Sequence, residues 1–216
     1  MAVVKRTRLS PEQRRAQLID LGAEMLADRP LEQISVEEIA ERAGVSPGLL
    51  FHYFASKQDF HLAIVRHANE EMIAYTAADP SVVKAGDPMR VLRSVLSSYI
   101  DYACDNRTCY VSLSRGPASG NPDMRAIFEE TRVVMCERIL EQLRMLAIEP
   151  TSAVVLSVRG WIAYVEEVTI TWLHNPLHNP QLSRDELIDI AAQALPALAV
   201  AAAPEMAAVL QEATAS

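Results

Sequence analysis

The chain has 216 residues, enough to bury a hydrophobic core and to form one or two domains. Half of its residues are hydrophobic and 22% are charged, a balance that excludes a mainly disordered chain. The net charge of −8 argues against a nucleic-acid partner, and three cysteines without CxxC spacing indicate neither a disulfide framework nor a zinc cluster. A reducing cytoplasm fits this composition best.

The chain begins with a basic segment. Residues 1–15 contain five basic residues and one acidic residue, so the acidic excess lies in the rest of the chain. Taken alone, this start fits a solvated, disordered segment as well as an arm that contacts a polyanion. No apolar run follows the early basic residues, so we expect no secretory signal.

Capping residues mark the starts of several helices. A Ser followed three residues later by Gln or Glu is a capping box, and this pattern occurs at Ser10, Ser35 and Ser183. Apolar residues recur at helical spacing after each box, and Gly44 is expected to end the second helix. No segment shows the alternation of a strand, so the sequence predicts an all-α protein.

A third helix follows the second almost at once. Ser46-Pro47 opens it, and the connecting AGVSP has the length and chemistry of a helix-turn-helix, although an ordinary helical corner would share this spacing. Leu50 and Phe54 fall on one face, where they can pack on the first two helices. The outward face is expected to contain Gly48 and His52, flanked by Leu49, Phe51 and Tyr53.

This outward face has the chemistry to dock on DNA. A small residue at position 48 permits close approach, apolar side chains can meet thymine methyl groups, and His52 and Tyr53 can donate hydrogen bonds to phosphates. Lys57 begins a fourth helix, which runs toward Ala78 and is capped by Ser56, and its ammonium group can also reach the DNA backbone. The alternative is that the aromatic side chains here are simply core residues.

The rest of the chain is expected to consist of helices separated by loops. Residues 78–88 and 114–123 are loops by composition, and Pro196 should kink or end the last helix. The stretch 154–173 has the length of a membrane span, but it contains charged residues, so we expect a buried helix and no membrane partner. Apolar residues recur at helical spacing over 92–103, 135–146, 151–173 and 183–199.

The residues of the first three helices and the start of the fourth form a recognisable combination. ISVEEIAERAGVSPGLLFHYFASKQDF, with the preceding QLIDLGAEMLADRP, resembles the DNA-binding domain of TetR-family transcriptional regulators over about residues 10–66. The combination of the A-G-V-S turn, the aromatic end of the third helix and the following Lys is specific, whereas the downstream chain is similar only in layout. The resemblance implies a basic arm, a helix-turn-helix domain, a connecting helix, a helical ligand-binding and dimerisation domain, and an Ala-rich tail, at 1–9, 10–56, 57–78, 79–203 and 204–216.

Matching this family residue by residue implies particular roles in DNA binding. The entry of the recognition helix faces bases, and it consists of Ser46, Pro47, Gly48 and Leu49. The positions that match backbone contacts, or in the case of Glu37 lie beside one, are Ser35, Glu37, His52, Tyr53 and Lys57. The arm that could add minor-groove or backbone contacts contains Lys5, Arg6 and Arg8.

Three residues depart from the family pattern. Phe51 occupies a position that is usually Tyr, so only an apolar contact is expected there. Leu49 stands where the family commonly has a small hydroxyl residue, so one phosphate hydrogen bond that the resemblance implies is not assured here. Pro30 replaces a frequent Gly after the first helix, and should alter only that turn.

The second domain contains large side chains that could line a cavity, although each of them singly is more typical of a core. Because the family resemblance implies a pocket among the central helices, we select as candidates Tyr99, Tyr102, Phe128, Met135, Trp161 and Tyr164. Glu166 or Glu167 could contact a ligand or a subunit partner, or could simply be a satisfied charge. The helices at 151–173 and 183–199 resemble a dimerisation pair, and a two-fold dimer would recognise a palindromic operator on double-stranded DNA.

The sequence contains no strong motif of an enzyme. His174 and His178 are separated by Pro176, which breaks the helix that would align them as metal ligands, and we expect no metal and no cofactor. No Gly-rich phosphate loop or nucleophile elbow occurs. Free cysteines are usually buried and inert, although a role in sensing oxidants is conceivable for Cys104, Cys109 and Cys136.

The sequence therefore predicts a cytoplasmic, homodimeric, ligand-responsive transcriptional regulator and not an enzyme. We expect a repressor that a small, mostly apolar effector releases from operator DNA by tilting the fourth helix and changing the separation of the two recognition helices. The alternatives are a helical protein-interaction module and an oxidant-sensing regulator that uses its cysteines.

Overall fold

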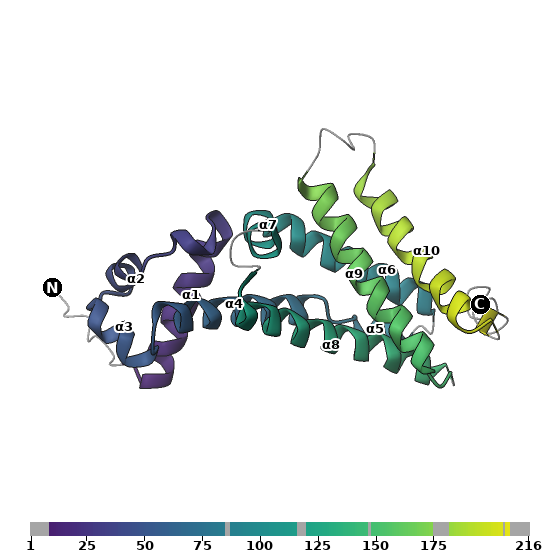
Figure 1. Ribbon diagram of the computed structural model, residues 1–216, viewed down its shortest axis with the longest axis horizontal. Helices are drawn as coiled ribbons and strands as arrows, with labels where there is room; N and C mark the ends of the chain where they lie inside the picture. Colours follow the sequence, from purple (N-terminus) through teal and green to yellow (C-terminus); the bar gives the residue numbers. More distant parts are fainter. Residues whose placement is uncertain are drawn as a thin grey trace.

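The computed structural model describes residues 9–84, 87–115, 120–146, 148–174, 182–204 and 206–207. Within these residues every regular element is a helix, which confirms the all-α prediction. Figure 1 shows a small group of helices at the N-terminal end and a larger group toward the C-terminus, with α4 running from one group into the other. The basic arm, including Lys5, Arg6 and Arg8, lies outside the described residues.

The N-terminal group consists of α1, η1, α2 and α3, which span Pro11–Asp28, Leu31–Gln33, Val36–Ala43 and Pro47–Tyr53. The capping box at Ser10 is confirmed, because its side chain accepts from the Gln13 N–H while the Gln13 side chain accepts from the Ser10 N–H. The second expected box is only half formed. Ser35 accepts from the Glu38 N–H, but the Glu38 carboxylate is paired with Arg29 instead, at 2.9 Å.

A tight turn joins α2 to α3, as the sequence predicts. Gly44 ends α2 with a φ of 66°, the left-handed conformation that glycine adopts most easily. Leu50 and Phe54 are 0% and 1% exposed, so the inward face of α3 is confirmed, and the Phe54 ring packs on that of Phe60 in α4, with centroids 4.9 Å apart. These contacts fix the orientation of α3 on the first two helices.

The second group differs from expectation in several places. The fourth helix ends at Tyr75 rather than near Ala78, a one-turn helix lies inside the expected loop at 78–88, and α7 is not predicted at all. Pro196 lies inside α10, which continues to Ala202, so the expectation that it might end the helix is wrong. The bounds are α4 Lys57–Tyr75, α5 Pro80–Lys84, α6 Pro88–Asp105, α7 Arg107–Arg115, α8 Pro122–Met145, α9 Ser152–His174 and α10 Arg184–Ala202.

Two hydrophobic clusters form the core. The second is built from α6, α8, α9 and α10, and Trp161 ties α9 to α10 by donating its Nε1–H to the Ala191 carbonyl at 2.8 Å. The first contains most of the buried residues of α1 to α4, but it also includes Cys109 and Leu113 of α7 and Met124 and Ile127 of α8. The core of the helix-turn-helix is therefore continuous with the nearest part of the second domain.

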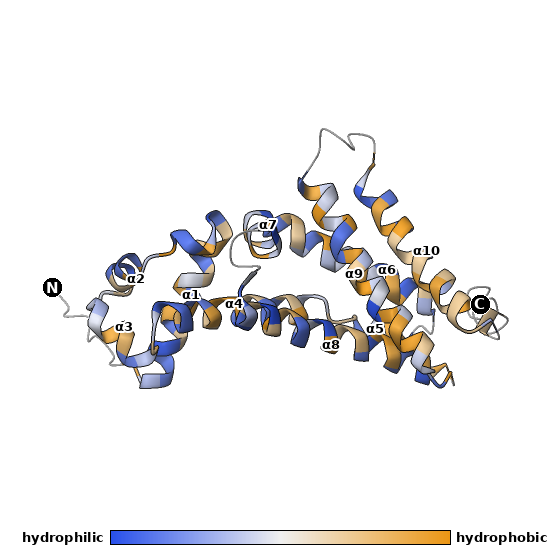
Figure 2. Ribbon diagram, in the orientation of Figure 1, coloured by the Kyte–Doolittle hydropathy of each residue, from blue (hydrophilic) through white to orange (hydrophobic). Residues whose placement is uncertain are grey.

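Charged residues inside the apolar helix α9 have partners. Arg159 pairs with Glu129, and Glu166 pairs with Arg132, so neither charge is left alone on this helix. None of the helices in the described residues is long and apolar enough to cross a membrane. Figure 2 shows that hydrophobic residues are concentrated along α9 and α10. The Ala-rich tail after Pro204 lies almost wholly outside the described residues.

Candidate DNA-binding surface and ligand cavities

The outward face of α3 is open to solvent. Pro47, Gly48, Phe51 and His52 are exposed, and Phe51 leaves 49% of its surface accessible even though it is aromatic. The remaining candidates are less open: Leu49 is half-buried, and Tyr53 is half-buried against the first cluster with its ring edge-on to that of His52. The third helix of this domain therefore presents a mixed apolar and polar surface.

Side-chain caps mark the start of α3 and the start of α4, the helix that follows it. Ser46 is exposed, and its hydroxyl accepts from the Leu49 N–H at 3.3 Å. At the start of α4, Ser56 accepts from the Asp59 N–H at 3.0 Å, while the Asp59 carboxylate accepts from the Ala55 N–H at 2.9 Å. This reciprocal cap starts α4 at Lys57, whose side chain is exposed one turn beyond the end of α3.

The expected contacts on α2 lie at its N-terminal end. Ser35 is the N-cap residue and is half-buried, whereas Glu37 is exposed in the first turn. An acidic side chain here is favourable for the helix because it complements the positive end of the helix dipole.

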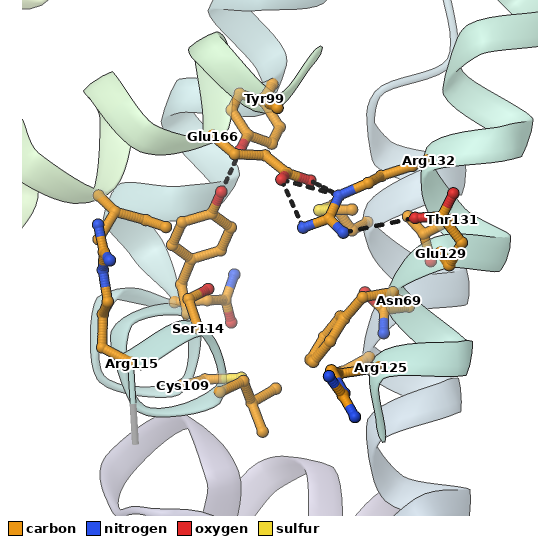
Figure 3. Close-up of a pocket in the computed structure, with 18 of the residues that line it drawn as sticks. Asn69, Tyr99, Cys109, Ser114, Arg115, Arg125, Glu129, Thr131, Arg132 and Glu166 are labelled. Atoms are coloured by element: carbon orange, nitrogen blue, oxygen red, sulfur yellow. Dashed lines mark hydrogen bonds and ion pairs between the residues drawn. The ribbon is translucent and has the colours of Figure 1, made fainter. Parts of the chain in front are cut away.

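The second domain contains a cavity of about 800 Å³ between α4, α6, α7, α8 and α9, which has more polar side chains in its wall than the second cavity described below and is called here the polar cavity. Three of the sequence candidates line it, namely Tyr99, Tyr102 and Phe128. Figure 3 shows Asn69 and Arg125 on one wall, facing Ser114 and Cys109 across the cavity, with Arg132 and Glu166 at one end. Cys109 and Leu113 line this cavity and also belong to the first hydrophobic cluster.

A second cavity of about 820 Å³ lies between α4, α6, α8, α9 and α10, and is called here the apolar groove. Met135 and Trp161 line it, together with many aliphatic side chains such as Leu92, Val95 and Leu96. The candidates chosen from the sequence are thus divided between two cavities. Tyr164 lines neither of them and packs on the second cluster instead.

Hydrogen-bonded pairs lie where the two cavities meet. The Arg132 guanidinium donates to both oxygens of Glu166, at 2.8 to 3.1 Å, and this bond is the main cause that raises the pKa of Arg132. Close by, the Tyr99 and Tyr110 hydroxyl groups hydrogen-bond to each other. Burial raises the pKa of both phenols, so both remain neutral donors or acceptors.

The three cysteines are free, and their surroundings favour the thiol. Burial raises the pKa of the Cys109 thiol to about 12, and it also raises the pKa values of Cys104 and Cys136. Because the thiolate is the reactive form, these environments disfavour the oxidant-sensing alternative. No group of three or more His, Cys, Asp or Glu side chains that could hold a metal occurs in the described part of the chain, which does not include His178.

Sequence reasoning missed several residues that line the polar cavity. Asn69, Tyr110, Arg125 and Arg132 carry its polar groups, and they come from α4, α7 and α8. Polar residues on separate helices give no local pattern, so only the tertiary fold brings them together.

An apolar surface is also exposed on α9 and α10. Leu156 is 71% exposed on α9, and Ile190 and Leu198 are 44% and 38% exposed on α10. Gly160 is exposed on α9 as well, and a Cβ atom added there would have no neighbour within 4 Å. Large exposed apolar side chains on two adjoining helices are typical of a contact surface.

Comparison with known proteins agrees with this architecture. Residues 18–64 match the family model described as bacterial regulatory proteins, tetR family, and residues 88–195 match a tetracyclin repressor-like C-terminal domain. A crystal structure of a tetR-family regulator from Streptomyces coelicolor is 27% identical, with a TM-score of 0.79 over 96% of this chain and 90% of that one.

Two further relatives are informative. The transcriptional activator FasR of Mycolicibacterium smegmatis is 23% identical over 169 residues, which cover 78% of this chain and 76% of that protein. The regulator FadR of Bacillus subtilis, solved in complex with stearoyl-CoA, is 19% identical with a TM-score of 0.61 over 85% of this chain and 97% of that one, a likeness of fold.

A helix-turn-helix domain joined to a second helical domain, with relatives of this kind, defines a DNA-binding transcriptional regulator. The chain belongs to the tetR family.

Proposed function

We propose that this protein is a homodimeric repressor that binds a palindromic operator through α3 and is released by an effector bound in its second domain. The observation that carries the proposal is the exposed outer face of α3, which is capped by Ser46 at its start and followed closely by the capped start of α4 at Lys57. A helix of this kind after a tight turn can enter the major groove of DNA.

Each part of the surface has a distinct role in this proposal. Ser46, Pro47, Gly48 and Leu49 begin α3 and face base edges, while Phe51 offers an apolar contact to thymine methyl groups. Polar contacts to the phosphates come from Ser35, His52, Tyr53 and Lys57. The basic arm adds further contacts to the DNA. The protein as a whole is acidic, so its attraction to the DNA phosphates depends on the few basic residues at this end of the chain.

Binding to DNA can be tested with duplexes selected from a random pool by the purified protein. The selected site should be a palindrome, and its affinity should fall steeply with salt. Lys57→Gln should weaken binding to all sequences and reduce the salt slope by about 0.9 for each phosphate that is no longer neutralised. Lys84→Gln is the matched control, because Lys84 is exposed on α5, far from α3 in sequence. Selection of no preferred sequence, or equal binding by both variants, would argue against α3 as the reading element.

The dimer is proposed to form through α9 and α10. Leu156, Ile190 and Leu198 supply the exposed apolar groups that a second copy of the chain would cover. Leu156→Glu should therefore convert the dimer to a monomer in sedimentation experiments, since it would bury an unpaired charge. Met145→Glu places the same charge at a position that is 65% exposed on α8, and should leave the dimer intact. A dimer that survives Leu156→Glu would place the interface elsewhere.

The effector is proposed to be a small, mostly apolar molecule. The aliphatic walls of the groove support this class, and the complex of Bacillus subtilis FadR with stearoyl-CoA supports the view that this fold can hold a long-chain ligand. A route to the DNA-binding domain exists, because Cys109 and Leu113 belong both to the cavity wall and to the hydrophobic cluster of α1 and α4. A ligand that moves these side chains would shift the helices that carry α3.

A further inference from the structure

The polar cavity contains a hydrogen-bond donor that has no partner. The Nδ2 atom of Asn69 is buried from solvent and donates to no acceptor in the described residues, and Asn69 lies on the wall of the cavity. Leaving a buried amide donor unpaired is unfavourable, so such a group in a cavity wall is suited to an acceptor atom of a ligand.

All but one of the charged side chains that line this cavity form ion pairs with other described residues. Glu166 pairs with Arg132, Glu167 with Arg115, and Glu129 with Arg159 and Arg132. Arg125, by contrast, forms no ion pair with any described residue and lies on the same wall as Asn69. Asn69, whose donor is buried, and Arg125, whose side chain is exposed, therefore offer donors and positive charge on one wall of the cavity, across from side chains whose own charges are already matched.

The polar cavity and the apolar groove adjoin. Five residues line both of them, and they come from α4, α6, α8 and α9: Met72, Tyr99, Thr131, Arg132 and Glu166. Beyond this junction the groove is lined mainly by apolar side chains, with Met135, Trp161 and Leu195 among them. A ligand that fits both spaces must be polar at one end and apolar over the rest of its length.

We propose that the two cavities hold one amphipathic ligand, an acyl chain with an anionic head, in a fixed direction. The head accepts hydrogen bonds from Asn69 and Arg125, and the chain passes Tyr99 into the apolar groove. This inference rests on the proposed binding of an effector and adds its chemical class and orientation. It also places the charged head beside Cys109 and Leu113, in the part of the cavity that is continuous with the helix-turn-helix core.

The chemistry of the two sites favours this direction over its reverse. The two arginines that line the groove already donate hydrogen bonds, Arg132 to Glu166 and Arg138 to the Ile73 carbonyl. A carboxylate placed among the aliphatic side chains there would lose its hydration, which is costly. At Asn69 and Arg125 the same group gains charge-assisted hydrogen bonds. A cationic head would instead face Arg125 directly and be repelled.

The proposal can be tested by calorimetric titration of the full-length protein, without DNA, using dodecanoate and dodecanol as probes. Dodecanoate should bind at least about tenfold more tightly than dodecanol, because only the carboxylate can satisfy both donors. Arg125→Gln and Asn69→Leu should each remove most of this preference while changing dodecanol binding little. Arg90→Gln, at an exposed Arg that lines neither cavity, is the matched control and should change nothing.

Two further variants keep the outcome interpretable. Met135→Gln should weaken both probes alike, because it acts on the chain and not on the head. Asn69→Leu should leave the melting temperature unchanged or raise it, since it removes an unpaired buried amide, so its loss of dodecanoate binding cannot be attributed to unfolding. Tighter binding of dodecanoyl-CoA than of dodecanoate would assign the head to a coenzyme thioester, and the opposite order to a free carboxylate.

An unchanged ratio of the two affinities in both Arg125→Gln and Asn69→Leu would overturn the proposal. So would a failure of dodecanoate and dodecanoyl-CoA to bind the wild-type protein. Neither result bears on operator recognition, which is measured separately, so this inference and the DNA-binding proposal can fail independently.

Discussion

Gly22 offers the sharpest test of the packing that supports α3. It lies in the middle of α1, where α1 crosses α4, and a Cβ atom added there would lie 2.4 Å from Cδ1 and 2.6 Å from Cγ1 of Ile64. Ile64 is 0% exposed, so it cannot swing into solvent to make room. We therefore expect Gly22→Ala to separate α1 from α4 and to destabilise the protein.

The magnitude follows from two opposing effects. Alanine in a helix interior gains about 1 kcal/mol over glycine, whereas overpacking a closed core typically costs about 1 to 3 kcal/mol. With contacts as short as these the cost should lie in the upper part of this range, at about 2 to 3 kcal/mol, giving a net loss of about 1 to 2 kcal/mol in the free energy of unfolding. Urea unfolding of both proteins, followed by circular dichroism, measures the difference.

Gly48→Ala is the matched comparison for this substitution. Gly48 is also helical, but an added Cβ would meet only Ser46 Oγ, at 4.0 Å, so stability should be unchanged or slightly higher. Operator affinity should fall nevertheless, because the added methyl group stands on the surface proposed to approach DNA. A Gly22→Ala protein as stable as wild type would refute the close crossing of α1 and α4.

Three other predictions concern single side chains. Trp161→Phe removes the hydrogen bond to the Ala191 carbonyl and should cost about 0.5 to 1.5 kcal/mol in urea unfolding, and no loss would mean that this bond does not hold α9 to α10. Because its pKa is raised to about 12, the Cys109 thiol should resist iodoacetamide at pH 8 in the folded protein and react once urea unfolds it, so rapid labelling under native conditions would contradict its burial. Burial lowers the pKa of His61, so the unfolded chain takes up a proton that the folded chain excludes, and the free energy of unfolding should decrease as the pH falls below 6.5. Unfolding of wild type and His61→Gln at pH 7 and pH 5 should show a smaller pH dependence in the variant, and equal dependence would assign the effect to other groups.

Local signals account for the parts of the fold that could be predicted. The caps at Ser10 and Ser183 and the left-handed Gly44 depend on residues within a few positions of each other, and all three are found where the sequence places them. The inward face of α3 follows equally from helical spacing. The half-formed box at Ser35 shows the limit of this reasoning, because Glu38 has a competing partner nine residues away.

The parts that could not be predicted depend on tertiary contacts. The helix α7 has only two buried residues, Cys109 and Leu113, and a single residue separates it from α6, so it has almost no pattern of its own. The bond between Arg132 and Glu166 joins residues 34 positions apart. The family resemblance implied a pocket lined by large side chains, but not that these would be divided between two cavities or that polar groups would line one of them.

The central claim is that a ligand in the second domain changes the affinity of the first for DNA through their shared hydrophobic cluster. Its most direct measurement is the fluorescence anisotropy of labelled operator, held in complex with the protein, while dodecanoyl-CoA or dodecanoate is added. We predict that the DNA is released over the same concentration range in which the ligand binds, and that Arg125→Gln needs more ligand for the same release. A complex that stays intact after the cavities are saturated would contradict the claim.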